Sequence, residues 1–305
     1  MFSNALLILS DFALIALGLL LARLWSDDFN RAFWTGAEKL VYYVLFPALL
    51  FNSINRANFS LATEATVLAV ATAAFLTTVA LSFASRPLLR VPADIFASCV
   101  QTGFRYNSYI GLALAQSLLG ARGVLLLALI IGVCIPLANL FAVYALARHA
   151  ERGFLREVVR NPLILATVGG LVTNLLGWTL PPLLSSSLLE RLGNGGLALG
   201  LMCIGAGLRF DMVDVPRRVP VVFTAITLLV FPALALGYIT LAGLRGVEAQ
   251  LVMLFAALPT ASTAYVLAAR MNGRAEAVAF IITLQTLLAV LMLPLWFALA
   301  PRAGT

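Results

Sequence analysis

Apolar blocks of about 20 residues recur along the whole chain, and their length constrains the fold more than any other feature. A helix needs about 20 such residues to cross the hydrocarbon layer of a bilayer, because each residue advances it by about 1.5 Å. The sequence is 62% hydrophobic and only 11% charged, whereas soluble domains are roughly half apolar. We therefore expect an all-α, multi-pass membrane protein with the lipid bilayer as its main environment.

Ten membrane spans are predicted, and no large soluble domain remains between them. The first block has no basic residue before it and no small-residue cleavage site, so we interpret it as a retained helix and not as a signal peptide. The approximate spans are 4–24, 37–55, 61–85, 94–119, 123–147, 162–179, 183–208, 218–243, 247–269 and 274–298.

The basic residues are distributed unequally between the two sets of alternating loops. One set holds fourteen of them: Arg23, Arg31, Lys39, Arg86, Arg90, Arg148, Arg152, Arg156, Arg160, Arg209, Arg217, Arg218, Arg270 and Arg274. The other set holds five: Arg56, Arg122, Arg191, Arg245 and Arg302. Positive residues concentrate on the cytoplasmic side, so both termini are expected outside. Because these residues are dispersed singly, the net charge of +7 does not indicate a nucleic-acid partner.

A polar connection divides the spans five and five. We predict a first repeat at 1–150, a cytoplasmic linker at 151–161 and a second repeat at 162–305. With an odd number of spans per half, the second half enters the membrane inverted relative to the first. The segment "YIGLALAQSLLGARG" in span four resembles "YVLAARMNGRAE" in span nine, although shared composition would also produce such a likeness.

Span four contains a polar interruption, "FRYNSY". Asn107 and Ser108 have short side chains that suit the N-cap of a restarted helix. Arg105 is the one basic residue placed within a predicted span. Such an interruption is tolerated only inside protein or beside a watery cavity.

Span nine contains a second interruption, "ALPTASTAY". Pro259 removes a backbone donor and clashes with the preceding turn. Three hydroxyl residues follow it as candidates for capping the restarted helix or lining a site: Thr260, Ser262 and Thr263. Both interruptions fall in the fourth span of their half, and paired breaks of this kind indicate a central transporter site.

The breaks favour binding of an anion. Each restarted half-helix carries about half a positive charge at its N-terminus. Arg105 adds a full charge and can bind a carboxylate through two parallel hydrogen bonds. Because an arginine inside a span costs about 2.5–3.5 kcal/mol, it needs a partner or a wet cavity. That partner is a substrate anion in one interpretation; in others it is the C-terminal ends of the first half-helices, or a fixed acid such as Asp11.

Other polar residues indicate little chemistry beyond binding. Asp11 within span one is a candidate for proton coupling, or else has water access or a local partner. Gly196 and Gly200 permit a close helix contact, within the chain or across a dimer. No histidine-rich, cysteine-rich, paired-carboxylate or phosphate-loop pattern occurs within the spans. We therefore expect no enzyme activity, metal or cofactor.

Several segments resemble the auxin efflux carrier family, within the larger group that includes the bile acid carriers. They are "VLFPALLFNSI" in span two, "YNSYIGLALAQSLLG" in span four, "LALGLMCIGAGLRF" in span seven and "LPTASTAYVLAARMNG" in span nine. The lack of a large central loop is similar to the bacterial form. Ala113 departs from the family's usual proline, and Arg105 stands just before the matched asparagine.

The resemblance implies ten helices in which spans four and nine unwind and cross. It implies a scaffold of spans 1, 2, 6 and 7, often dimeric, past which a bundle of spans 3–5 and 8–10 moves like an elevator. Asn107 corresponds to the family's crossover asparagine and Pro259 to its crossover proline. The implied substrates are organic anions such as auxin, malate or malonate.

We therefore expect a secondary or facilitative carrier of small carboxylates in a bacterial inner membrane. The substrate-binding residues expected are Arg105, Asn107, Ser108, Pro259, Thr260, Ser262 and Thr263. The coupling ion is either H+ or Na+. The alternatives are a sodium-coupled symporter resembling the bile acid carriers, and a membrane receptor or regulatory subunit that binds an anion without transporting it.

Overall fold

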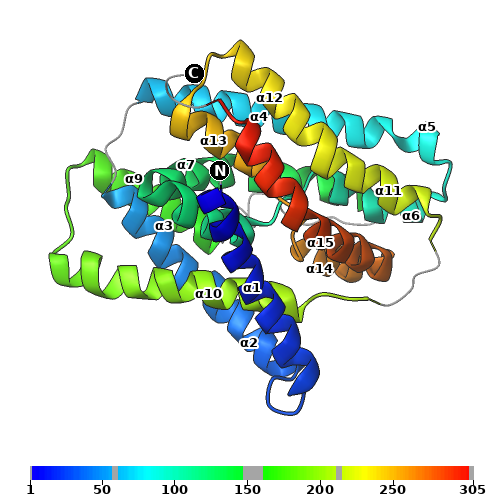
Figure 1. Ribbon diagram of the computed structural model, residues 1–305, viewed down its shortest axis with the longest axis horizontal. Helices are drawn as coiled ribbons and strands as arrows, with labels where there is room; N and C mark the ends of the chain where they lie inside the picture. The colour runs from blue at the N-terminus through cyan, green and yellow to red at the C-terminus, as the bar shows by residue number, and fades with distance from the viewer. Residues whose placement is uncertain (1, 57–60, 147–160, 211–214, 302–305) are drawn as a thin grey trace. The chain divides into compact units, whose positions relative to one another are not determined.

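The computed structural model describes residues 2–56, 61–146, 161–210 and 215–301. Within these ranges the secondary structure is helical, with no strand (Figure 1). The predicted linker at 151–161 lies outside the described residues, apart from Asn161. By length and composition, five stretches of helix are suited to crossing a membrane among these residues: Leu7–Leu24, Glu64–Leu89, Ala93–Leu146, Arg218–Leu241 and Ala275–Leu299. The chain is thus an all-α, multi-pass membrane protein.

The helices group into two compact units, and each unit draws on both halves of the sequence. The first unit contains part of α7, Tyr109–Gly132. This part belongs to predicted spans four and five, which the family resemblance assigns to the moving bundle and not to the scaffold. The other elements of the first unit are α1 (Phe2–Leu24), α2 (Arg31–Leu40), the π-helical turn η1 (Val41–Leu45), α3 (Phe46–Asn55), α9 (Pro162–Leu175), the π-helical turn η3 (Leu183–Leu189) and α10 (Glu190–Ala206).

In the first unit, small residues let α10 pack closely on its neighbours. A Cβ atom at Gly196 would lie 2.7 Å from the Cβ of Leu45, and one at Gly200 would lie 3.0 Å from the Phe46 ring. These glycines therefore make a helix contact within the chain, which was one of the two alternatives for them. α1 packs on another part of α10, and α3 packs on α9 (Figure 1).

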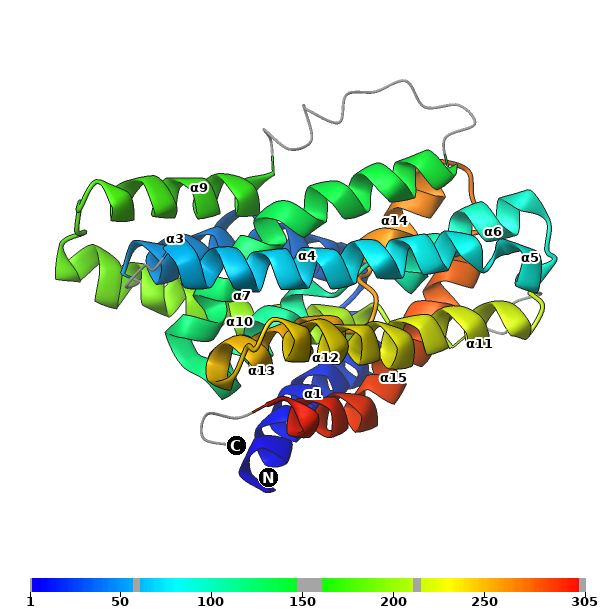
Figure 2. The same cartoon turned by 90° about the horizontal axis from the view of Figure 1, so that it is seen from above.

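The second unit contains the remaining helices. These are α4 (Leu61–Ala84) from Ala65 onward, α5 (Arg86–Leu89), α6 (Ala93–Cys99), the 3₁₀ turn η2 (Val100–Gly103), α7 (Ser108–Leu146) from Val133 onward, α11 (Arg218–Ala225), the π-helical turn η4 (Ile226–Val230), α12 (Phe231–Leu241), α13 (Gly246–Ala256), α14 (Thr263–Arg270) and α15 (Ala275–Leu299). α12 lies beside α13, as Figure 2 shows, and α15 packs on α6, α11 and α13. Phe75, Phe104, Phe223 and Phe255 are fully buried in its core.

The helix α7 contains one sharp deviation. Gly120 has φ 60° and ψ −154°, a conformation outside the helical region that glycine adopts without a steric penalty. This residue lies between predicted spans four and five, 94–119 and 123–147. Gly120 therefore separates two helices, at the boundary expected between these spans.

Candidate functional site

The predicted interruption in span four is present. α6 ends at Cys99, η2 ends at Gly103, and residues 104–107 are not helical before α7 begins at Ser108. Gly103 allows this segment to approach α4, because a Cβ atom there would lie 2.5 Å from the Ser82 Oγ. The break is buried: Asn107 is 2% exposed and Ser108 is 9% exposed.

The predicted interruption in span nine is also present. α13 ends at Ala256, and α14 begins at Thr263. Ser262 holds the N-cap position but makes no side-chain capping bond. The Thr260 hydroxyl donates to the Thr102 carbonyl, and the Thr263 hydroxyl accepts from Arg105. The Ser262 side chain therefore does not cap α14, and the Thr260 and Thr263 hydroxyls bond to Thr102 and Arg105 in span four.

The two breaks meet within the second unit. The backbone N–H of Asn107 donates to the Pro259 carbonyl at 2.8 Å. Unpaired backbone groups are costly away from water, and this bond satisfies one group from each interrupted helix. The bond thereby brings together two residues, Asn107 and Pro259, that lie far apart in the sequence.

A network around the Thr102 carbonyl supports this meeting point. The carbonyl accepts from Thr227 Oγ1 at 2.7 Å, Thr260 Oγ1 at 2.8 Å and Gln285 Nε2 at 3.0 Å. The Gln285 Oε1 also accepts from the Thr260 N–H at 3.0 Å. Gln285 lies within predicted span ten, and its partners are not identifiable from the sequence.

Arg105 is held by two neutral groups. Its Nη1 donates to Thr263 Oγ1 at 2.9 Å, and its Nη2 donates to Asn139 Oδ1. A hydrogen bond to a charged group contributes about 1.5–3 kcal/mol, so two of them offset the roughly 2.5–3.5 kcal/mol cost of an arginine within a span. Neither of these two partners carries a negative charge.

The surroundings of Arg105 are partly open. Arg105 is 6% exposed, Asn139 is half-buried and Thr263 is exposed. The neighbouring Tyr106 packs edge-on against Phe255 with ring centroids 4.7 Å apart. Its hydroxyl is buried and has no hydrogen-bond partner among the described residues. The two groups that accept hydrogen bonds from the guanidinium are therefore more exposed than Arg105 itself.

Asp11 belongs to the first unit, on α1. Its Oδ2 accepts from the Ser117 hydroxyl at 3.1 Å, which is a local partner of the kind considered for it. The breaks and their contacts described above belong to the second unit. Among the described residues, no group of three or more His, Cys, Asp or Glu side chains could hold a metal ion.

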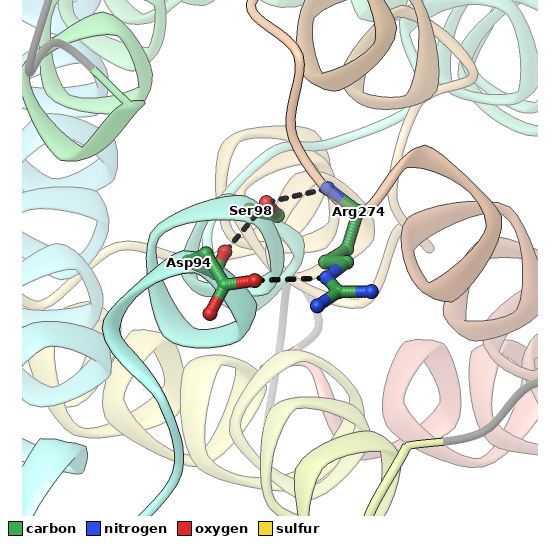
Figure 3. Close-up of polar contacts among 3 residues, drawn as sticks. All are labelled: Asp94, Ser98 and Arg274. Atoms are coloured by element: carbon green, nitrogen blue, oxygen red, sulfur yellow. Dashed lines mark hydrogen bonds and ion pairs between the residues drawn. The ribbon is translucent and has the colours of Figure 1, made fainter.

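An ion pair joins the start of α6 to the turn between α14 and α15 (Figure 3). Arg274 Nε donates to Asp94 Oδ2 at 2.8 Å, and the Arg274 N–H donates to Ser98 Oγ at 2.8 Å. Ser98 Oγ in turn donates to the Asp94 carbonyl. The charged side chains are more than half exposed, so the pair is worth about 0–1 kcal/mol and mainly orients the turn.

Comparisons with known proteins agree with a transport role. Residues 146–297 match a family model described as "Membrane transport protein". The chain is 27% identical over 301 residues to a protein of Rhizobium meliloti (strain 1021) named "Putative malonate transporter", covering 93% of this chain and 92% of that relative. It is 24% identical over 265 residues to an "Uncharacterized transporter" of Methanothermobacter thermautotrophicus, covering 85% and 86% respectively.

Proposed function

Because this chain belongs to the auxin efflux carrier family of membrane transport proteins, we propose that it carries small organic anions across a bacterial inner membrane. The observation that carries this proposal is the contact between the two breaks, with Arg105 bonded to the first residue of the restarted helix α14. A positive side chain and two helix N-termini then occupy one region.

The chemistry of this region suits a carboxylate. The guanidinium can donate two parallel hydrogen bonds to a carboxylate, and the N-terminus of a helix attracts negative charge. We assign the charge to Arg105 and orientation of the substrate to the Asn107 amide. The residues that line the site are Ser108, Pro259, Thr260, Ser262 and Thr263. The name of the Rhizobium relative makes malonate, a small dicarboxylate, the first substrate to test.

The division into units supports alternating access. Arg105, Asn139, Thr263 and both breaks belong to one compact unit. Their mutual contacts can therefore persist while that unit moves. We propose that the bundle carrying the breaks moves against the scaffold, as in an elevator, with dimerisation through the scaffold and both termini outside. Crosslinking within the second unit should leave malonate uptake unchanged. Crosslinking the second unit to the first should abolish uptake.

Uptake of malonate into proteoliposomes tests the role of Arg105. Arg105→Ala should lower uptake by about 10- to 100-fold, because it removes charge-assisted hydrogen bonds. Arg105→Lys is the matched control: it keeps the charge, loses the planar fork and should retain more uptake. Unchanged uptake by Arg105→Ala would remove Arg105 from the mechanism. If the unaltered protein binds malonate but does not accumulate it, the protein is a receptor.

The same vesicles address coupling. An imposed proton or sodium gradient should accelerate uptake if that ion is coupled. If Asp11 carries the proton, Asp11→Asn should lose the response to a proton gradient while malonate binding persists. An intact proton response would exclude Asp11 from coupling.

A further inference from the structure

Asn139 lies on α7, 34 residues beyond Arg105, and holds one tip of its guanidinium. Thr263 on α14 holds the other tip, so two different helices fix the fork. Resting on the proposed function, we propose that Asn139 is a positioning residue: it aims Arg105 at the anion, and its neutral amide makes the site select negative substrates.

Arg105 donates a hydrogen bond from each of its two terminal nitrogens. A guanidinium has five N–H donors, and the two bonds engage one donor on Nη1 and one on Nη2. A long arginine side chain has many rotamers, and fixing both tips selects one of them before a substrate arrives. Binding is then favoured because less freedom is lost when the anion binds.

The Asn139 side chain carries no charge. The Asn139 Oδ1 accepts a hydrogen bond without bringing a negative charge to Arg105. An aspartate has the same size and could accept the same bond, but its carboxylate would compete directly with a substrate carboxylate for the guanidinium. The charge of the side chain at position 139 therefore determines whether the site attracts an anion.

Asn139 also differs in setting from Thr263. Thr263 is the first residue of a restarted helix, whereas Asn139 lies within α7, more than a turn from either helix end, and is half-buried. A residue within a helix is a more precise anchor than one at a break. The sequence did not distinguish it, because several asparagines lie within predicted spans.

The test uses full-length protein, malonate as the probe and two measurements. The first is the malonate concentration that gives half-maximal uptake in proteoliposomes, and the second is the melting temperature without malonate. For Asn139→Asp we expect the half-maximal concentration to rise by about 10- to 100-fold. The melting temperature without malonate should stay level or rise, because the new carboxylate pairs with Arg105.

Asn139→Ala should raise the half-maximal concentration by a smaller factor, since it removes the orientation but adds no charge. Asn194→Asp is the control: it adds the same charge at an exposed position on α10, and uptake should not change. A merely structural Asn139 would show a lowered melting temperature and an unchanged half-maximal concentration in both variants.

The outcomes separate the two proposals. If the unaltered protein accumulates malonate and both Asn139 variants match it, the positioning role is wrong and the transport proposal stands. If Asn139→Asp cannot be purified, an unchanged half-maximal concentration in Asn139→Ala overturns the role by itself. If the unaltered protein accumulates no organic anion, the proposed function fails and the role fails with it.

Discussion

At the scale of the residue, close backbone contact depends on single glycines. A Cβ atom at Gly205 would lie 1.7 Å from the Ile15 carbonyl oxygen, and one at Gly18 would lie 2.0 Å from the Met202 carbonyl oxygen. No real contact is this short, so α1 and α10 can touch only where the side chain is absent. This contact is distinct from the one that Gly196 and Gly200 make with η1 and α3.

Gly205→Ala should therefore lower the free energy of unfolding by about 1–3 kcal/mol or more, since a methyl group would force the two backbones apart. Gly195→Ala in the same helix is the matched control, because nothing lies within 4 Å of a Cβ atom there. It should be neutral or stabilise by about 0.5–1 kcal/mol through helix propensity. Melting in one detergent compares them; equal effects would show that the α1–α10 contact does not depend on Gly205.

At the scale of the element, one carbonyl connects several interrupted helices. The Thr102 carbonyl ends the first half of span four, and its donors come from η4, the break after α13, and α15. Gln285 contributes twice, as a donor to Thr102 and as an acceptor for the Thr260 N–H. One side chain of α15, Gln285, thus bonds to both breaks.

Gln285→Leu should cost about 1–3 kcal/mol of stability, because it leaves the buried Thr260 N–H without this acceptor. Thr227→Val should cost less. A carbonyl has two lone pairs, and Thr260 and Gln285 would still supply donors to both. Thermal melting of the two purified variants gives the comparison. A larger loss for Thr227→Val would contradict this account of the network.

At the scale of the whole molecule, the distribution of basic residues predicts the topology. Three native cysteines are buried, Cys99, Cys134 and Cys203, so an impermeant thiol reagent should react little with the unaltered chain. A single cysteine introduced at an exposed loop position then reports which side of the membrane that loop occupies.

Ser26→Cys lies in a predicted cytoplasmic loop and Ala242→Cys at the outer end of predicted span eight, beside an outer loop, and both positions are exposed. In intact spheroplasts the reagent should label Ala242→Cys and label Ser26→Cys only after the membrane is opened. We expect this pattern because loops rich in Lys and Arg remain on the cytoplasmic side of the membrane. The reverse pattern would place both termini inside.

The helical class, the membrane environment and the positions of the two breaks can all be predicted from the residues along the chain. These are local properties: an apolar length matches the bilayer, Pro259 cannot donate, and Asn107 and Ser108 disfavour a continuous helix. The backbone must satisfy its own hydrogen bonds in lipid, so local interruptions are readable from the residues alone.

Which polar side chains meet depends instead on how the helices pack. Asn52, Asn139 and Asn174 are equivalent by sequence, yet Asn139 is bonded to Arg105 while Asn174 donates to the carbonyls of Ile54 and Asn55. The choice depends on the register at which packed helices bring distant side chains within 3 Å or so of one another, the length of a hydrogen bond. Neither hydropathy nor spacing along the chain encodes that register.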